Sequence, residues 1–258
     1  MIVTPPRRSS ANPGAGGGLL AGCKDAPTPL EVKSDHQLLP IVGSKVSTAD
    51  QAKAILEAAA ARYASMKSYS DCGAVHTQLN QCDPVFSTSF STWFKRPSFF
   101  RFSFERPHPY PPLRYVITRH IVGFDGRRAY SSTQRDGEPR IEDKQSLALA
   151  IAGATGISSG SAHTIGRLLL PEIDGISILD FLDIRLNPET AADGVACHCV
   201  SGRYPKGNAT AELWIEKGSL LVRKVTTTPG SGKPPSTEVR NSIHVDEPIA
   251  ETLFQLAA

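Results

Sequence analysis

The residues best suited to chemistry are one serine and three histidines. The stretch GISSG at 156–160 matches the Gly-x-Ser-x-Gly pattern that surrounds many nucleophilic serines, with Ser158 at its centre. His163, His198 and His244 are possible bases. The pattern is productive when the serine sits on a sharp turn from a buried strand into a helix. Here a helix-like segment precedes it, so a serine hydrolase is the least favoured of three functional hypotheses, and we expect no enzyme.

A second chemical pattern is the stretch CHC, in which Cys197 and Cys199 share one face of a strand and His198 lies on the other. Zinc sites need paired ligand clusters at fixed spacings, and the sequence offers no second cluster. No paired acids suit glycoside hydrolysis either. We therefore expect no catalytic residues, no metal and no cofactor.

The most unusual stretch is FSTSFSTWFKRPSFFRFSF at 86–104, which holds seven of the ten phenylalanines. Side chains alternate between the two faces of a strand, and KRPS suits a hairpin connection between two strands. Six rings would then share one sheet face, while serines, Arg101 and Glu105 occupy the other. These candidate ligand-binding residues, which we call the phenylalanine wall, are Phe86, Phe90, Phe94, Phe100, Phe102 and Phe104.

Two apolar segments follow this meander. Residues 143–156 are apolar on nearly every side, as expected of a helix that is buried or sits inside a concavity. A second helix is predicted in SAHTIGRLLLP, where Pro171 ends it. We add Leu147 and Ile151 to the candidate ligand-binding residues. Two interpretations remain open: the phenylalanine wall binds a ligand, or the helical pair fills the concavity and the wall is core.

The other elements predict an antiparallel α+β fold. Helical spacing of Ile55, Leu56, Ala59, Tyr63 and Met66 predicts a helix from Ser47 or Thr48 to about residue 66. A strand follows at about 69–79, and tight turns are expected at Asp125-Gly126 and at Lys217-Gly218, with Gly218 at positive φ. A sheet of eight or more strands must curl or split. The sequence predicts one domain, 47–258, built as a curved antiparallel sheet forming an unclosed half-barrel, with helices covering its concave face.

Residues 1–46 are expected to form a disordered leader or tether, because they are rich in Pro, Gly and Ser. Within them LLAGC resembles a bacterial lipobox with Cys23 as the lipidated residue, and the alternative is a chance match in a small-residue linker. The remaining cysteines, Cys72, Cys82, Cys197 and Cys199, allow three disulfide pairings. The net charge of +3 and the scattered basic residues argue against nucleic-acid binding.

Three stretches resemble the lipoprotein-localisation (LolA/LolB-like) superfamily, of the outer-membrane lipoprotein-sorting type. AILEAAAARYASMKSYSDCGAV is similar to its opening helix and first strand, TAELWIEKGSLLVRKV to its late hairpin, and NSIHVDEPIAETLFQL to its end. The resemblance covers about 47–256. One departure from the superfamily's pattern is the helical insertion at 143–170.

The resemblance implies an unclosed barrel whose concave face holds acyl chains. Members carry lipoproteins across the periplasm, receive them at the outer membrane, or sense envelope lipids and lipoproteins, as RseB-like regulators do. We therefore expect non-catalytic binding of an acyl chain or an acylated lipoprotein by a monomer. The protein would be exported, and periplasmic or anchored to the outer membrane through Cys23. The alternative is an envelope sensor or regulator that contacts a protein partner.

Overall fold

The computed structural model describes residues 47–256, apart from residues 79, 81–84, 109, 114 and 189. The predicted tether, the lipidation of Cys23 and the pairing of Cys82 lie outside these residues and stay predictions.

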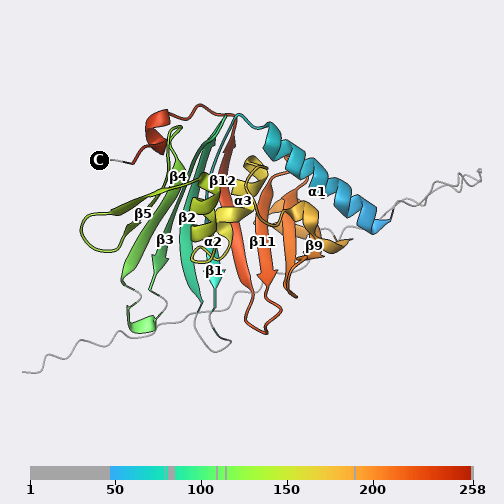
Figure 1. The fold of residues 1–258 in the computed structure, drawn as a ribbon. Helices are drawn as coiled ribbons and strands as arrows, with labels where there is room; N and C mark the ends of the chain where they lie inside the picture. Colours follow the sequence, from blue (N-terminus) through green and yellow to red (C-terminus); the bar gives the residue numbers. More distant parts are fainter. Residues whose placement is uncertain are drawn as a thin grey trace, which may run out of the picture. The chain divides into compact units, whose positions relative to one another are not determined.

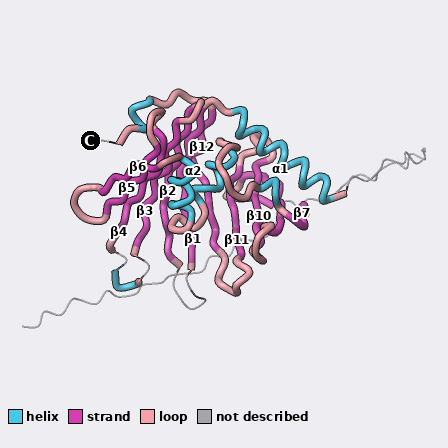
Figure 2. The backbone as a smooth tube through the Cα atoms, in the orientation of Figure 1, coloured by secondary structure: helices cyan, strands magenta, loops and turns pink. Residues whose placement is uncertain are grey.

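Strands of the described residues form one antiparallel sheet of 12 strands in the order β6-β5-β4-β3-β2-β1-β12-β11-β10-β9-β7, with β8 pairing β9 (Figures 1 and 2). Its two edges do not pair with each other, so the predicted unclosed half-barrel is confirmed. The first six strands are β1 Ser68–Thr77, β2 Phe86–Lys95, β3 Phe99–Pro107, β4 Ile117–Phe124, β5 Ala129–Gln134 and β6 Arg140–Lys144. The others are β7 Leu182–Leu186, β8 Thr190–Ala192, β9 Val195–Arg203, β10 Thr210–Glu216, β11 Val222–Thr228 and β12 Ser236–Val245.

Three α-helices lie on the concave side of this sheet (Figure 1). They are α1 Thr48–Ser65, α2 Leu147–Thr155 and α3 Ser161–Leu169, and short 3-10 turns occupy η1 Pro111–Leu113, η2 Ile178–Asp180 and η3 Glu251–Phe254. The N-cap of helix α1 is Ser47, one of the two predicted positions, and its hydroxyl accepts a hydrogen bond from the Asp50 amide. Helix α1 packs against β7, α3 and η2, while α2 packs against β4, β5 and β6.

The predicted pairing of the two aromatic strands is confirmed. Strands β2 and β3 form a hairpin in which Phe90 lies opposite Phe104 and Phe94 opposite Phe100. All six rings of the phenylalanine wall point to the concave face and are at most 5 % exposed. Helices α2 and α3 cover this part of the sheet, and a Cβ added at Gly166 of α3 would stand 3.5 Å from the Phe100 ring.

The structure adds three strands that the sequence analysis missed and corrects one turn. Strands β6, β7 and β8 have three to five residues each, too few for alternation to stand out. Gly218 is not at positive φ; Leu220 is, at 60°. The reason is a longer turn, in which the Leu220 amide donates to the Glu216 carbonyl and the left-handed residue comes last.

A single arginine holds two helix ends against the sheet. Arg96, in the β2–β3 hairpin, donates from Nε to the Met66 carbonyl at 2.9 Å and from Nη2 to the carbonyls of Ala64 and Leu169, at 2.5 and 3.1 Å. Its guanidinium also lies 5.1 Å from the centre of the Phe94 ring. A cation at a helix C-terminus satisfies the last carbonyls and complements the helix dipole. Arg96 does this for α1 and α3 together.

We expect Arg96→Ala to lower the free energy of unfolding by about 2 to 3 kcal/mol, because hydrogen bonds from a charged donor contribute more than neutral ones. Urea unfolding measures the loss. Arg127→Ala removes an exposed guanidinium from the nearby turn between β4 and β5 and should change stability by less than about 0.5 kcal/mol. Equal losses in the two variants would contradict the role of Arg96 as a shared cap.

Candidate functional site

A cavity lies on the other half of the concave face, away from the phenylalanine wall. Its volume is about 460 Å³. Helix α3 and the link that precedes it form one side, residues 174–178 form another, and strands β10, β11 and β12 form the base. The floor consists of buried apolar side chains from both layers: Leu168, Ile178, Phe181, Leu213 and Val225.

Polar groups enter the cavity at a few defined places. Glu238 of β12 is buried on the floor, and Thr164 of α3 donates to its Oε2 at 3.0 Å. Burial raises the pKa of Tyr204, whose hydroxyl is hydrogen-bonded to Thr227. Asp174 is an exposed lining residue, and its carbonyl oxygen lies 3.2 Å from Nε2 of His163. An apolar floor with few polar groups is typical of ligand sites.

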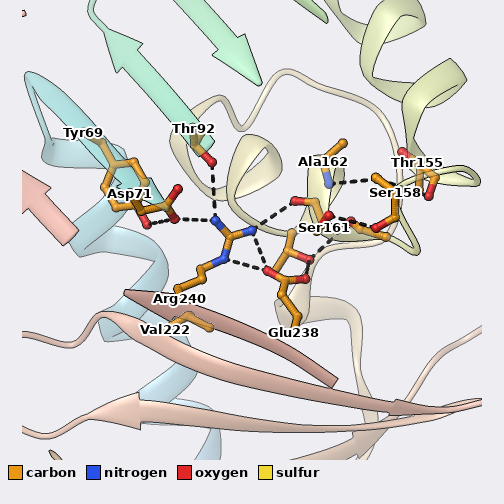
Figure 3. A network of polar contacts seen from close by, with 12 residues as sticks. Tyr69, Asp71, Thr92, Thr155, Ser158, Ser161, Ala162, Val222, Glu238 and Arg240 are labelled. Carbon is orange, nitrogen blue, oxygen red and sulfur yellow. Dashed lines mark hydrogen bonds and ion pairs between the residues drawn. The ribbon is translucent and has the colours of Figure 1, made fainter. Parts of the chain in front are cut away.

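Behind Glu238 lies a buried ion network centred on Arg240 of β12 (Figure 3). The Arg240 guanidinium bonds Glu238 Oε1 from Nε at 2.6 Å and the Ser161 carbonyl at 3.0 Å. It also pairs with the Asp71 carboxylate of β1, which accepts a further bond from the Tyr69 hydroxyl at 2.6 Å. The network therefore joins β12, β1 and the first residue of α3.

The one cation of this network has two anionic partners. The Arg240 side chain is fully buried, and burial works to lower its pKa, but the carboxylates of Asp71 and Glu238 outweigh that effect and raise it. The guanidinium also lies 4.7 Å from the centre of the Phe90 ring, a favourable cation–π position. Removing one partner of such a buried pair leaves an uncompensated charge, which costs several kcal/mol.

Ser158, the centre of the Gly-x-Ser-x-Gly pattern, is not placed as a nucleophile. It is fully buried in the link between α2 and α3. Its hydroxyl accepts a hydrogen bond from the Ala162 amide at 3.2 Å and lies 3.4 Å from the Thr155 carbonyl. His244 is hydrogen-bonded to Glu247, and His198 lies on β9. Among the described residues, neither histidine forms a hydrogen bond with Ser158. The geometry is that of a helix-linking turn.

The structure separates the predicted site residues from the cavity. Phe94, Phe100 and Phe102 are fully buried, and Phe86, Phe90 and Phe104 are nearly so. Ile151 is buried, and Leu147 packs against the core at partial exposure. None of these eight lines the cavity. Their contact with a ligand stays a prediction.

The residues that sequence reasoning missed are charged ones on a buried face. Glu238 and Arg240 point to the concave side and Val239 between them points away, although Val239 is the residue that a hydrophobic pattern would turn inward. A signal existed in β1, where Asp71 falls in alternation between the buried Tyr69 and Val75. An inward-facing carboxylate of that kind needs a buried cation.

The described cysteines are free thiols and form no metal site. Cys72 is exposed, while Cys197 and Cys199 are buried on the face of β9 opposite Val200. Burial raises the pKa of both buried thiols. No group of three metal-ligating side chains occurs among the described residues, and none of their helices is long and apolar enough to cross a membrane.

Unfolding at alkaline pH tests the packing of α1 beside the Arg240 network. Tyr63 of α1 accepts a hydrogen bond from the Val222 amide, and burial raises its pKa to about 12. Its unfolded pKa is about 10, so its stabilising effect is complete below pH 10 and is lost as the pH rises to 12. We expect Tyr63→Phe to lose less stability than the wild type over this range, by on the order of 2 kcal/mol. Tyr115→Phe, at an exposed position, should follow the wild type; a parallel decline in all three proteins would contradict the assignment.

Comparison with known proteins shows likeness at the level of fold. No family model and no curated protein matches the sequence. LprF from Mycobacterium bovis is 15 % identical, with a TM-score of 0.49 over 80 % of this chain and 97 % of its own. Lipoprotein LppX from Mycobacterium tuberculosis is 12 % identical, with a TM-score of 0.45 over 78 % and 97 %. A putative outer membrane lipoprotein-sorting protein domain from Vibrio parahaemolyticus is 8 % identical, with a TM-score of 0.38 over 80 % and 97 %.

Proposed function

We propose that the chain binds, without catalysis, one acyl chain of a lipid or of an acylated lipoprotein in a bacterial cell envelope. The observation that carries this proposal is the cavity of about 460 Å³ with its floor of buried apolar side chains. Ligand pockets commonly measure between roughly 300 and 1,000 Å³. Each buried methylene contributes about 0.8 kcal/mol, so eight of them would contribute about 6 kcal/mol without any polar contact.

The phenylalanine wall is a proposed extension of this site. Helices α2 and α3 lie between the two regions: Thr155 and Leu168 line the cavity, whereas Ile151 and Gly166 face the wall. A longer chain would reach the six rings by displacing this helical pair. Export, periplasmic or outer-membrane location and anchoring through Cys23 belong to the same proposal and rest on the sequence.

Native mass spectrometry of the protein extracted from its host tests the proposal directly. We expect bound molecules with the masses of acyl-containing lipids or lipopeptides. A preparation that carries no lipid but retains a stable membrane-protein partner would favour the envelope sensor instead.

The location of the site is tested by Val225→Phe, which adds a ring to the cavity floor. We expect it to weaken binding of a fluorescent fatty-alcohol probe, whose head group is neutral, at least tenfold, with little change in melting temperature, because the ring enters open space. The matched control is Val239→Phe on the neighbouring strand. Val225 lies opposite Glu238 in the β11–β12 register, so Val239 is one position further on and faces the other side of the sheet. Equal probe binding by Val225→Phe and the wild type would place the ligand elsewhere.

Ser158→Ala tests the remaining catalytic hypothesis. We expect a fluorophosphonate to leave the wild type unlabelled and the variant to bind the fatty-alcohol probe normally, because the hydroxyl is buried. Loss of the hydrogen bond from the Ala162 amide should cost about 1 kcal/mol of stability. Covalent labelling of wild type that disappears in a folded Ser158→Ala protein would revive the hydrolase.

A further inference from the structure

The cavity and the network behind it carry an uncompensated negative charge. Among the described residues, Glu238 and Asp174 line the cavity, and Asp71 joins Glu238 through Arg240. The guanidiniums of Arg167 and Arg240 are the cations of this group, and the imidazole of His163, which also lines the cavity, is counted as neutral. The three carboxylates and two guanidiniums have a net charge of −1. Two of the carboxylates, Asp71 and Glu238, are buried.

Glu238 is the member of this group that a ligand can meet on the cavity floor. It is only 5 % exposed, and both Nε and Nη2 of Arg240 bond its Oε1 atom, at 2.6 and 2.5 Å. Its Oε2 atom receives one hydroxyl, from Thr164 at 3.0 Å. That hydroxyl also lies 3.3 Å from the Gly160 carbonyl, so its single hydrogen serves two acceptors. A carboxylate oxygen can accept two hydrogen bonds, so Oε2 has capacity for another donor.

The second carboxylate of the network, Asp71, also lacks a donor. Asp71 Oδ1 is buried without a hydrogen-bond partner in the described residues, although Oδ2 of the same carboxylate bonds both Arg240 and Tyr69. A buried acceptor without a donor is costly. Arg240 is thus shared by two carboxylates that together have more acceptor capacity than it can satisfy. One further cation at Glu238 would balance the group.

We infer that the ligand is a single-chain amphiphile with one primary ammonium group, which binds Glu238 while the alkyl chain lies on the apolar floor beside Leu213 and Val225. This inference rests on the proposed function, because it assigns the polar end of the ligand in the same cavity. An ammonium has three donors and one positive charge. It therefore supplies both the donor that Oε2 can accept and the charge that the group lacks.

Arg167 supplies the opposing hypothesis, an anionic head group. It lines the cavity, and its Nε is buried without a partner in the described residues. Its guanidinium is nevertheless bonded to the Pro171 carbonyl at the end of its own helix. An anion there would raise the negative excess from one charge to two. The charge balance therefore favours the ammonium.

Calorimetric titration of the full chain with three ligands of equal chain length tests the inference: decylammonium, decanol and decanoate, each below its micelle concentration. We expect decylammonium to bind at least tenfold more tightly than decanol, as a hydrogen bond between charged groups implies, and decanoate to bind most weakly. This ranking needs no variant. Equal binding of all three, or tighter binding of decanoate, overturns the inference and leaves the proposed function standing. Binding of none of them overturns both.

The variant Glu238→Gln tests whether Glu238 causes the preference for the ammonium ligand. It keeps the shape and removes the charge, so decylammonium should lose its advantage to within about threefold of decanol, whose own affinity should not change. Glu212→Gln is the matched control, because it removes the same charge from an exposed position on the opposite face of β10. Persistence of the full ammonium preference in a folded Glu238→Gln protein would overturn the assignment, and an unfolded variant leaves the wild-type ranking as the deciding result.

Discussion

The buried guanidinium of Arg240 is the interaction on which the arrangement of this protein depends. It sits at the middle of the sheet, because β12 joins the β1–β6 half to the β7–β11 half. Desolvating such a cation costs several kcal/mol unless partners surround it. Here two carboxylates, a backbone carbonyl of α3 and the face of Phe90 do so. The position of α3 over the sheet is thereby fixed by charge as well as by packing.

This fixed position divides the concave face into two unlike halves. On one side, the small residues of α2 and α3, such as Ala150, Ala154 and Gly166, let the helices approach the phenylalanine wall closely. On the other side, the base is Leu213, Val225 and the charged Glu238, and the helices leave a cavity. Within one unclosed sheet, the concavity is therefore filled as core over the phenylalanine wall and open as a cavity beside it.

Local patterns predicted the fold well wherever one face of an element is apolar. The alternation of Phe90, Phe94, Phe100 and Phe104 determines strand identity, face and register together, since slippage by one residue would expose all the rings. Helix α1, capped by Ser47, was equally clear from its cap and its apolar spacing. Strand β6 was missed because Arg140–Lys144 is a charged edge strand, and charges on an edge are a protection against further pairing rather than a core signal.

The candidate site was not predicted because its charged residues break the alternation of apolar and polar side chains from which the fold was predicted. Glu238 and Arg240 look like the solvent face of β12, and they face inward only because Asp71 stands across from them on β1, 169 residues earlier in the chain than Arg240. That dependence on a distant partner also explains the excess acidity. Asp71 and Glu238 are both needed to hold one guanidinium, and the second carboxylate introduces a negative charge that the network does not neutralise. The same requirement that fixes α3 over the sheet therefore leaves the adjoining cavity suited to a cationic guest.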